Sequence, residues 1–372
     1  MNEPRHVPDW WRAPDGNWYP RPPIPTKEET QHRWHDHRSR SIRPVMVIVL
    51  ATLLVIVCGV GWTLTRGAPE GPASAANSLS GVADKPGASG TAPATTRPPS
   101  ARAATWWVPP LGDPSWQWEL DHPLDLTNPT DMGTDDTLPD GRPAAAPVVY
   151  DIDGIENSKS TVNALHQLGD HVICYIEVGS AGDYYSAAQE GIPATYYDQF
   201  EAAGVLGDKL SDYPESFLNI ESPATVSIVE SMIDQQCAAK GFDAVETDLD
   251  ETYSGSDGTT GFTLTRATEE QYMTTLANYM HGLRLGWIIK NPDDTGDTYA
   301  ADMEPLADGV LTEQCNQNNT CGLLTAYEGH KAVFDAEYPP ETTAEFCASD
   351  NALGFDGVAF PLALDGARHP CR

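Results

Sequence analysis

Four of the five acidic residues in GFDAVETDLDETY (241–253) crowd together directly after an apolar run: Glu246, Asp248, Asp250 and Glu251. A carboxylate that leaves water costs several kcal/mol unless it is paired or protonated, and like charges this close repel one another. If the chain is a strand here, side chains alternate between its faces, so Glu246 and Asp248 share one face. Two carboxylates on one strand face indicate a reactive site, a bound cation or a solvated edge.

A calcium loop is one alternative use of these carboxylates. The EF-hand pattern needs oxygen ligands at positions 1, 3 and 5 and glycine at position 6. Counting from Asp248, those last two positions are Thr252 and Tyr253, so the match fails. There is also no cysteine and histidine cluster at zinc spacing, no Gly-x-Ser-x-Gly elbow and no phosphate-binding glycine loop. We therefore expect no metal and no cofactor.

Apolar runs of strand length recur along the C-terminal part of the chain, at 148–153, 171–179, 216–220, 242–249, 284–291, 309–315, 331–338 and 357–364. Helix-like segments separate most of them. One ends on Gly169, and another has Ser222 as a cap, Pro223 in its first turn and Gly241 after it. Eight strands alternating with helices predict an α/β fold of the (β/α)8 TIM-barrel type, with an open doubly wound sheet as the alternative.

The functional site of such a barrel forms at the carboxyl ends of its strands. Polar residues end most of the predicted strands: Asp151, Asp153, Glu177, Asn219, Asp248, Lys290, Asn291, Glu313, Gln314 and Glu337. Carboxylates from several strands suit acid/base hydrolysis of a glycosidic bond, in which one carboxyl protonates the leaving oxygen and another attacks the sugar or activates water. Aromatic residues that could stack on sugar rings include Trp118, Tyr150, Tyr175 and Tyr253.

The charge is unevenly distributed along the 372 residues. Residues 1–102 hold 12 of the 22 Lys and Arg and 8 of the 54 Asp and Glu, a formal charge of +4, so residues 103–372 carry −36. Such a field repels nucleic acid and attracts cationic ligands. We expect no nucleic-acid partner and a cationic polysaccharide as a candidate substrate.

Residues 45–64, VMVIVLATLLVIVCGVGWTL, contain no charge and are long enough to cross a bilayer as a helix. Arg33, Arg38, Arg40 and Arg43 precede this segment and only Arg66 follows closely, so the positive-inside rule predicts a single-pass protein with a cytoplasmic N-terminus. The predicted domains are a Pro/Trp-rich cytoplasmic tail (1–44), the transmembrane helix (45–64), a disordered Ala/Gly/Pro/Ser/Thr linker (65–104) and an extracellular domain (105–372).

Six of the seven cysteines lie in the predicted extracellular domain, and an even count outside the membrane indicates disulfides. Cys315 and Cys321 enclose a short loop, which favours a bridge between them. Cys347 and Cys371 would then tie the C-terminus to the last helix. Cys174–Cys237 is the pairing that remains.

The C-terminal domain resembles glycoside hydrolase family 114, whose named activity is endo-α-1,4-polygalactosaminidase on a (β/α)8 barrel. The matching stretches occur in order: SWQWEL (115–120), YDID (150–153), VICYIEVGS (172–180), GFDAVETDLDETY (241–253), GFTLT (261–265), KN (290–291), EQC (313–315) and KAVFDAEY (331–338). The resemblance implies that Asp248 and Glu313 are the catalytic pair. It also implies a de-acetylated galactosamine polymer, which is a polycation, as the substrate.

The chain departs from the family pattern around these carboxylates. Thr247 and Leu249 stand where the family usually has Pro and Asn, and Glu177 stands at a family Ser. The carboxylates themselves are retained. Two functions therefore stay open: a membrane-anchored extracellular glycosidase, or a catalytically degenerate barrel that binds cell-wall or exopolysaccharide.

Specific roles follow for the acidic residues. Asp248 is expected to be the nucleophile or the water-orienting carboxylate, and Glu313 the general acid with a raised pKa. Glu246 is expected behind them, held ionised by Lys290 of the next strand. The residues expected to hold the sugar are Trp118, Tyr150, Asp151, Asp153, Tyr175, Glu177, Glu246, Tyr253, Lys290, Asn291, Gln314 and Glu337. Asp250 and Glu251 are expected in a loop that faces solvent or substrate.

Overall fold

The structure is a computed structural model that describes residues 10–12, 18–20, 106–112, 114–211, 213–339 and 342–372. The predicted transmembrane helix (45–64) and linker (65–104) lie outside the described residues. Of the predicted tail, two short strands are described, β1 (Trp10–Arg12) and β2 (Trp18–Pro20), which pair antiparallel. Within these described ranges, no helix has the length and apolarity to span a bilayer.

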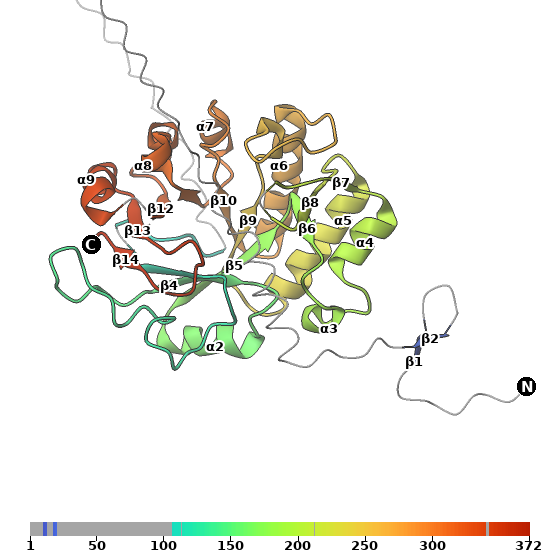
Figure 1. The fold of residues 1–372 in the computed structure, drawn as a ribbon, viewed down its shortest axis with the longest axis horizontal. Coiled ribbons are helices and arrows are strands. Elements are labelled where there is room, and N and C mark those ends of the chain that lie inside the picture. Colours follow the sequence, from blue (N-terminus) through green and yellow to red (C-terminus); the bar gives the residue numbers. More distant parts are fainter. Residues whose placement is uncertain (1–9, 13–17, 21–105, 113, 212, 340–341) are drawn as a thin grey trace, which may run out of the picture. The chain divides into compact units, whose positions relative to one another are not determined.

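One curled sheet organises residues 106–372 (Figure 1). Its strands are β3 (Trp116–Glu119), β4 (Val149–Asp153), β5 (His171–Glu177), β9 (Ala244–Asp248), β10 (Gly286–Lys290), β11 (Gly309–Glu313), β12 (Ala332–Glu337), β13 (Asp356–Ala359) and β14 (His369–Pro370). They are hydrogen-bonded in this order. All the pairings are parallel except that of β14, which pairs antiparallel with β13.

The curl of the sheet brings its first and last parallel strands together. The Trp116 indole of β3 donates a hydrogen bond to the Asp356 carbonyl of β13 at 2.8 Å. The apolar cluster inside the curl draws side chains from every one of the eight parallel strands: Trp116, Trp118, Val149, Ile173, Ala244, Ile288, Leu311, Ala332, Phe334, Ala336 and Val358. The fold is therefore TIM-barrel-like, with one core inside the sheet and a second between sheet and helices.

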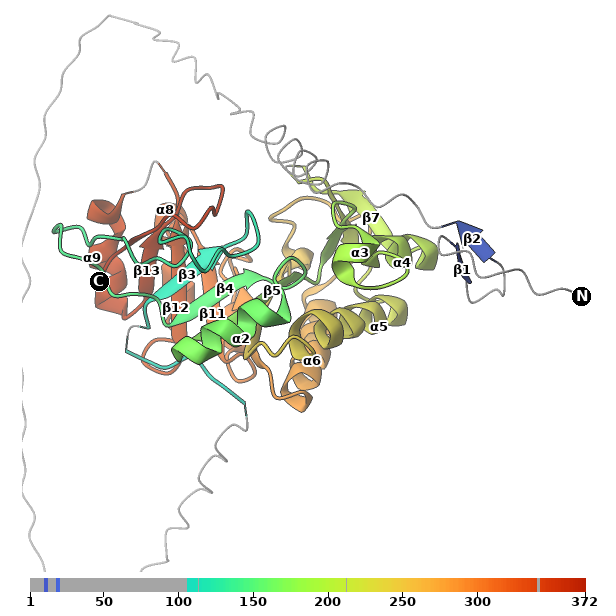
Figure 2. The ribbon, with the colours of Figure 1, turned by 90° about the horizontal axis from the view of Figure 1, so that it is seen from below.

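Helices cover the outer face of the sheet (Figures 1 and 2). They are α2 (Lys159–Leu168), α5 (Pro223–Met232), α6 (Arg266–Gly282), α7 (Tyr299–Met303), α8 (Cys315–Asn318) and α9 (Thr343–Leu353). Short turns at Thr252–Ser254 and Cys321–Leu324 are 3-10 helical. The larger apolar core lies between these helices and the outward side chains of the strands, such as Tyr150, Val245 and Trp287.

The helix ends follow the local sequence. The Ser158 hydroxyl accepts a hydrogen bond from the Thr161 amide at the start of α2, and Gly169 ends this helix with a φ of 96°. Ser222 caps α5, and Pro223 occupies its first turn, as expected. The difference from the expected helix is that Ile233–Ala238 continues as a π-helical segment rather than an α-helix.

The segment 216–220 is not part of the barrel-like sheet, so this expectation is wrong. It belongs to β8 (Glu215–Leu218), which pairs antiparallel with β6 (Ser180–Gly182) and β7 (Leu206–Lys209) in a separate small sheet. This sheet and the helices α3 (Ala187–Glu190) and α4 (Tyr196–Ala203) form an insertion between β5 and α5. The strand that sequence analysis omitted from the barrel is β3, which is short and precedes the other strands.

All three expected disulfides are confirmed: Cys174–Cys237, Cys315–Cys321 and Cys347–Cys371. Cys174–Cys237 joins β5 to the π-helical segment that follows α5. Cys315–Cys321 closes the turn after β11, and Cys347–Cys371 ties the C-terminus to α9.

Candidate active site

A single lysine joins the acidic residues at the carboxyl end of the sheet. Lys290, the last residue of β10, places its Nζ 3.4 Å from Asp248 Oδ1 of β9 and 3.1 Å from Glu313 Oε2 of β11. It also lies 3.2 Å from Glu246 Oε1, deeper on β9. Burial alone would lower the pKa of Lys290, but Asp248, Glu313 and Glu246 raise it well above its ordinary value, so Lys290 is cationic.

Asp248 and Glu313 remain open to solvent, whereas the lysine between them does not. Their side chains are 22% and 25% exposed, against 3% for Lys290. Strand alternation places Glu246 and Asp248 on the same inward face, as the sequence predicted. The two catalytic candidates are therefore brought together at the mouth, with their counter-ion beneath them.

Asp248 is oriented by two further donors. The Tyr175 hydroxyl donates to Asp248 Oδ2 at 2.5 Å, and the Leu249 amide donates to Oδ1 at 3.1 Å. Burial, together with the negative charge of Asp248, raises the pKa of Tyr175 well above its ordinary value, so this hydroxyl keeps its proton.

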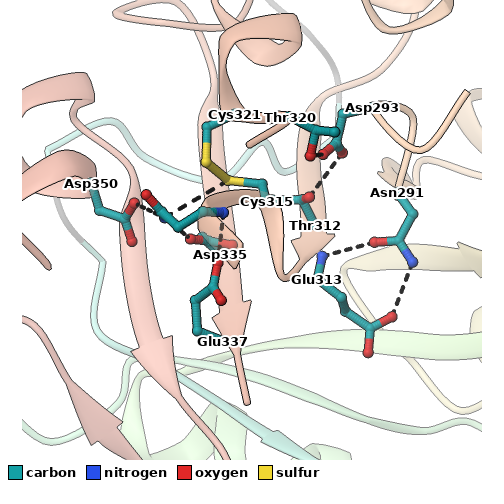
Figure 3. The surroundings of a disulfide bond; sticks show 11 residues. Asn291, Asp293, Thr312, Glu313, Cys315, Thr320, Cys321, Asp335, Glu337 and Asp350 are labelled. Atoms are coloured by element: carbon teal, nitrogen blue, oxygen red, sulfur yellow. Dashed lines mark hydrogen bonds between the residues drawn. A yellow bond between two sulfur atoms is a disulfide. The ribbon is translucent and has the colours of Figure 1, made fainter. Parts of the chain in front are cut away.

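Glu313 is held by Asn291 and Tyr338 in addition to Lys290. Asn291 Nδ2 donates to Glu313 Oε2 at 3.0 Å, while Asn291 Oδ1 accepts from the Glu313 amide at 2.8 Å (Figure 3). The Tyr338 hydroxyl donates to the other carboxylate oxygen. Burial favours a higher pKa, but Lys290, Tyr338 and Asn291 outweigh it and lower the pKa of Glu313. The expected rise in its pKa is therefore not found in the substrate-free site.

The inserted sheet builds a second acidic wall beside this cluster. Glu177, at the end of β5, and Glu215 of β8 both accept a hydrogen bond from the Tyr184 hydroxyl. Asp153 accepts hydrogen bonds from Tyr185 and from the amides of Ile155 and Glu156, so it caps its own loop. Burial, and for Glu177 also the charge of Glu215, raises the pKa of Asp153 and Glu177.

Four of the predicted sugar contacts do not reach the mouth, because two point outward from the sheet and two are buried deeper inside it. Tyr150 points outward from β4 into the helix-facing core, and Glu337 points outward from β12 and accepts from the Asn316 amide at 2.7 Å. Asp151 points inward but is fully buried. Trp118 is 1% exposed and packs beneath Lys290, whose Nζ is 4.7 Å from the ring centroid, so it cannot stack on a sugar.

Two of the predicted residues turn to their own loops. The Tyr253 hydroxyl donates to Asp297, and its ring packs edge-on against Tyr299. Gln314 follows Glu313 directly but donates to Gln317 at 2.7 Å. Among the described residues, neither side chain forms a hydrogen bond with Asp248, Glu313 or Lys290.

Asp250 and Glu251 are buried rather than solvent-facing, so this expectation is wrong. The Thr247 hydroxyl donates to Asp250 Oδ2 at 2.5 Å, and the Lys290 amide donates to the same oxygen at 3.2 Å. After Asp248 the chain leaves the strand through Leu249, which lies in the left-handed region at a φ of 58°, and the Asp250 carboxyl lies against the outward-facing Thr247. Asp250 therefore braces the backbone of β9 and β10.

The departures from the family pattern leave the carboxylates in place. Thr247 faces outward, where it accepts a hydrogen bond from the Trp287 indole at 2.8 Å. Leu249 packs against Leu210 and Phe217 of the insertion. Thr247 and Leu249 therefore contact the residues around β9. They do not alter the contacts between Asp248, Lys290 and Glu313.

Sequence reasoning missed three residues around the mouth. Tyr338 was detectable, because it follows Phe334 and Ala336 on the inward face of β12. Glu215 and Tyr213 come from the insertion, whose position no strand pattern reveals. Tyr213 is 59% exposed, and partial burial together with the charges of Glu313 and Asp248 raises its pKa to about 12.

One cluster superficially resembles a metal site. Cys315 Sγ, Cys321 Sγ and a carboxylate oxygen of Asp335 lie within 4.8 Å of one another. The two sulfurs are bonded to each other, so they offer no thiolate to a metal.

An acidic mouth on a TIM-barrel-like sheet, with two partly exposed carboxylates facing one lysine, defines the class of glycoside hydrolases. The sequence matches glycoside-hydrolase family GH114 over residues 95–372. The chain belongs to this family and is a glycosidase.

Two solved structures resemble the chain. Ega3 of Aspergillus fumigatus, in complex with galactosamine, is 26% identical, with a TM-score of 0.57 over 71% of this chain and 97% of Ega3. The glycoside hydrolase domain of PelA from Pseudomonas aeruginosa is 14% identical, with a TM-score of 0.47 over 68% of this chain and 97% of that domain. A comparison with curated proteins gives no match.

Proposed function

We propose that this chain is a membrane-anchored extracellular glycosidase that cleaves α-linked galactosamine-containing polysaccharide with Asp248 and Glu313. The observation that carries the proposal is the contact of both carboxylates with Lys290 at the carboxyl end of the sheet. A closed (β/α)8 barrel of the TIM type would account for that convergence.

The shared lysine limits the separation of the two carboxylates. Their lysine-facing oxygens are no more than about 6.5 Å apart, the sum of the two contact distances. Retaining glycosidases have carboxyl groups about 5–5.5 Å apart, and inverting enzymes about 6.5–9.5 Å. This limit is compatible with a retaining mechanism, which we propose for this pair.

In that mechanism Asp248 attacks the anomeric carbon while the bond to the leaving oxygen breaks. Glu313 gives its proton to that oxygen, and then accepts a proton from the water that releases the sugar from Asp248. The lowered pKa of Glu313 disfavours this protonated form in the free site. Lys290 and Tyr338 lower this pKa, so a leaving oxygen that displaces either of them from Glu313 raises the pKa and allows Glu313 to be protonated.

The substrate class is supported by charge. Residues 103–372 carry a formal charge of −36, and Glu177 and Glu215 face the same mouth as Asp248. Ammonium groups of a de-acetylated galactosamine polymer would pair with this wall, and the field would speed their arrival. The similarity to the galactosamine-bound Ega3 points to the same sugar.

Hydrolysis by the purified full-length chain tests the proposal. We expect release of shorter products from a de-acetylated α-1,4-linked galactosamine oligomer and much less from the fully N-acetylated oligomer of the same length. Binding of the first oligomer without cleavage at any pH from 4 to 8 would instead support a catalytically degenerate, polysaccharide-binding barrel.

The proposed membrane anchor and the extracellular position of residues 105–372 are supported by the uncharged segment 45–64 and the arginines before it. Protease added to intact cells should remove residues 105–372, while the N-terminal tail stays protected. Protection of the C-terminal domain until the cells are lysed would contradict this topology.

A further inference from the structure

Beneath the catalytic pair, two carboxyl groups face each other inside the sheet. Asp151 of β4 and Glu246 of β9 are both fully buried, and their side chains lie within hydrogen-bonding reach of each other. Both are one layer deeper than Asp153 and Asp248, the next inward residues of the same strands. Solvent and substrate therefore do not reach them.

Asp151 has no donor other than this neighbour. In the described part of the chain, no amide, hydroxyl or amino group donates to either of its carboxyl oxygens. An ionised carboxylate without a donor is prohibitively costly in a buried site. Two facing carboxyls can form a hydrogen bond only if one of them carries a proton. Burial, and next the charge of Glu246, raises the pKa of Asp151 well above its ordinary value.

Glu246 is the more readily ionised partner, because it contacts Lys290, although burial raises its pKa to about 7. An ammonium group has three N–H donors, and Lys290 has three carboxylate neighbours: Glu246 at 3.2 Å, Asp248 at 3.4 Å and Glu313 at 3.1 Å. Glu246 is thus the carboxylate neighbour of Lys290 that lies away from the mouth, and the other two neighbours are the catalytic carboxylates.

We propose that Asp151 is a protonated hydrogen-bond donor that fixes Glu246, and through it Lys290, so that Asp248 and Glu313 are held in register for the reaction. Asp151 and Glu246 are positioning residues in this scheme, because neither touches the substrate. The proposal rests on the proposed catalytic roles of Asp248 and Glu313. It replaces the expected contact of Asp151 with the sugar.

The charged and titratable groups around Glu246 come from four strands. They are Asp151 on β4, Tyr175 on β5 in register with Glu246, Asp248 on its own strand and Lys290 on β10. Removal of the charge of Glu246 leaves Lys290 more strongly directed at Asp248 and Glu313. The pKa of Glu313 should then fall further.

Three substitutions in the full chain test the scheme: Asp151→Asn, Asp151→Ala and Glu246→Gln. Asparagine is neutral and can donate to Glu246, so Asp151→Asn should keep kcat within about threefold of the parent. Asp151→Ala removes the donor, and we expect kcat to fall about 10–100-fold with KM changed less than threefold. Glu246→Gln should lower kcat similarly and shift the alkaline limb of the pH profile to lower pH.

A loss of kcat in Asp151→Asn as large as in Asp151→Ala would overturn the proposal, because an ionised or sugar-binding Asp151 predicts that result. An unshifted pH profile in Glu246→Gln would also overturn it, since a purely structural role lowers kcat at every pH alike. Thermal unfolding of each variant verifies that it is folded.

Infrared spectroscopy separates this proposal from the proposed function. Because other buried carboxyl groups also keep protons, the difference spectrum of the parent minus Asp151→Asn at neutral pH should contain the band of one protonated carboxyl, whether or not the chain hydrolyses galactosamine. An unchanged spectrum would contradict the protonation of Asp151 alone. A parent that fails to hydrolyse any oligomer would contradict only the proposed function.

Discussion

Two clusters of carboxylates lie on opposite faces of the same sheet, and they are neutralised in different ways. The inner cluster of Glu246, Asp248 and Glu313 surrounds the ammonium group of Lys290. The outer cluster consists of Asp335 and Glu337 of β12 and Asp350 of α9. Its members surround the side chain and amide of Asn316, beside the Cys315–Cys321 bridge. Figure 3 shows Glu313 and Asn291 on one side of this bridge and the outer cluster on the other.

The difference lies in the charge of the donor. Asn316 donates to Asp335 Oδ2 at 2.9 Å and to Asp350 Oδ1 at 2.6 Å, but an amide cannot balance a negative charge. Burial, followed by the charge of Asp350, raises the pKa of Asp335 well above its ordinary value. The outer cluster therefore keeps protons and is sealed, whereas the inner one keeps Glu313 ionised and open at the mouth. A lysine makes buried carboxylates available for chemistry, and an amide makes them structural.

The largest effect should come from removing the inner carboxylates. Asp248→Asn and Glu313→Gln should each lower kcat by about 10²–10⁴-fold in a protein that still folds, because each removes a group that acts on the reacting bond. The matched control is Glu337→Gln in the outer cluster, which should stay within about threefold of the parent. Loss of turnover in the control would break the division between the two clusters.

Lys290→Met should affect both activity and stability. Removing one partner of a buried ion pair typically costs about 3–5 kcal/mol, because it leaves uncompensated charge. The lowered pKa of Glu313 means that its contribution to stability is present above the pKa of an unfolded glutamate, and is lost as the pH falls through its folded pKa. The destabilisation measured by urea unfolding should therefore be large at pH 7 and smaller at pH 3. A pH-independent difference would argue against charge pairing.

The Cys315–Cys321 bridge seals the outer cluster, and its loss should cost less than loss of the other bridges. Chain entropy predicts about 2 kcal/mol for its separation of 6 residues, against about 3.5 kcal/mol for the 24 residues of Cys347–Cys371. Paired serine substitutions and denaturant unfolding measure both values. If the short bridge proves costlier, its packing against Asp335 and Asn316 contributes more than loop closure.

The smallest effect is expected from Asp335→Asn. The raised pKa of Asp335 means that the folded state binds a proton which the unfolded state has lost, so stability falls as the pH rises between the unfolded and folded pKa values. Asparagine can donate to Asp350 without a proton to lose. The variant should match the parent near pH 3 and be more stable by about 1–2 kcal/mol at pH 7. Lower stability than the parent at pH 7 would indicate an ionised Asp335.

Much of the architecture could be predicted from local sequence. Seven of the eight proposed barrel strands lie where apolar runs predict them, because a strand buried on both faces needs such a run. Glu246 and Asp248 share the inward face because side chains alternate, and the pairing of the cysteines followed from their spacing and order. Side chains also alternate along β12, so Glu337 and Tyr338 lie on opposite faces of the sheet. A choice of polar residues at strand ends that ignores this alternation selects Glu337 rather than Tyr338.

The sequence by itself determined seven of the eight parallel strands and the positions of Asp248 and Glu313 at strand ends, because these depend on neighbours along the chain. The disulfide pairs followed from the spacing and order of the cysteines. Only the tertiary structure decided that β8 belongs to an insertion, that Asp250 and Glu251 are buried, and that Lys290 is shared by three carboxylates. The protonation of Asp151 and the lowered pKa of Glu313 also depend on the tertiary structure. Burial and through-space charge set them, and both arise from residues that are distant in sequence and adjacent only after the sheet has curled.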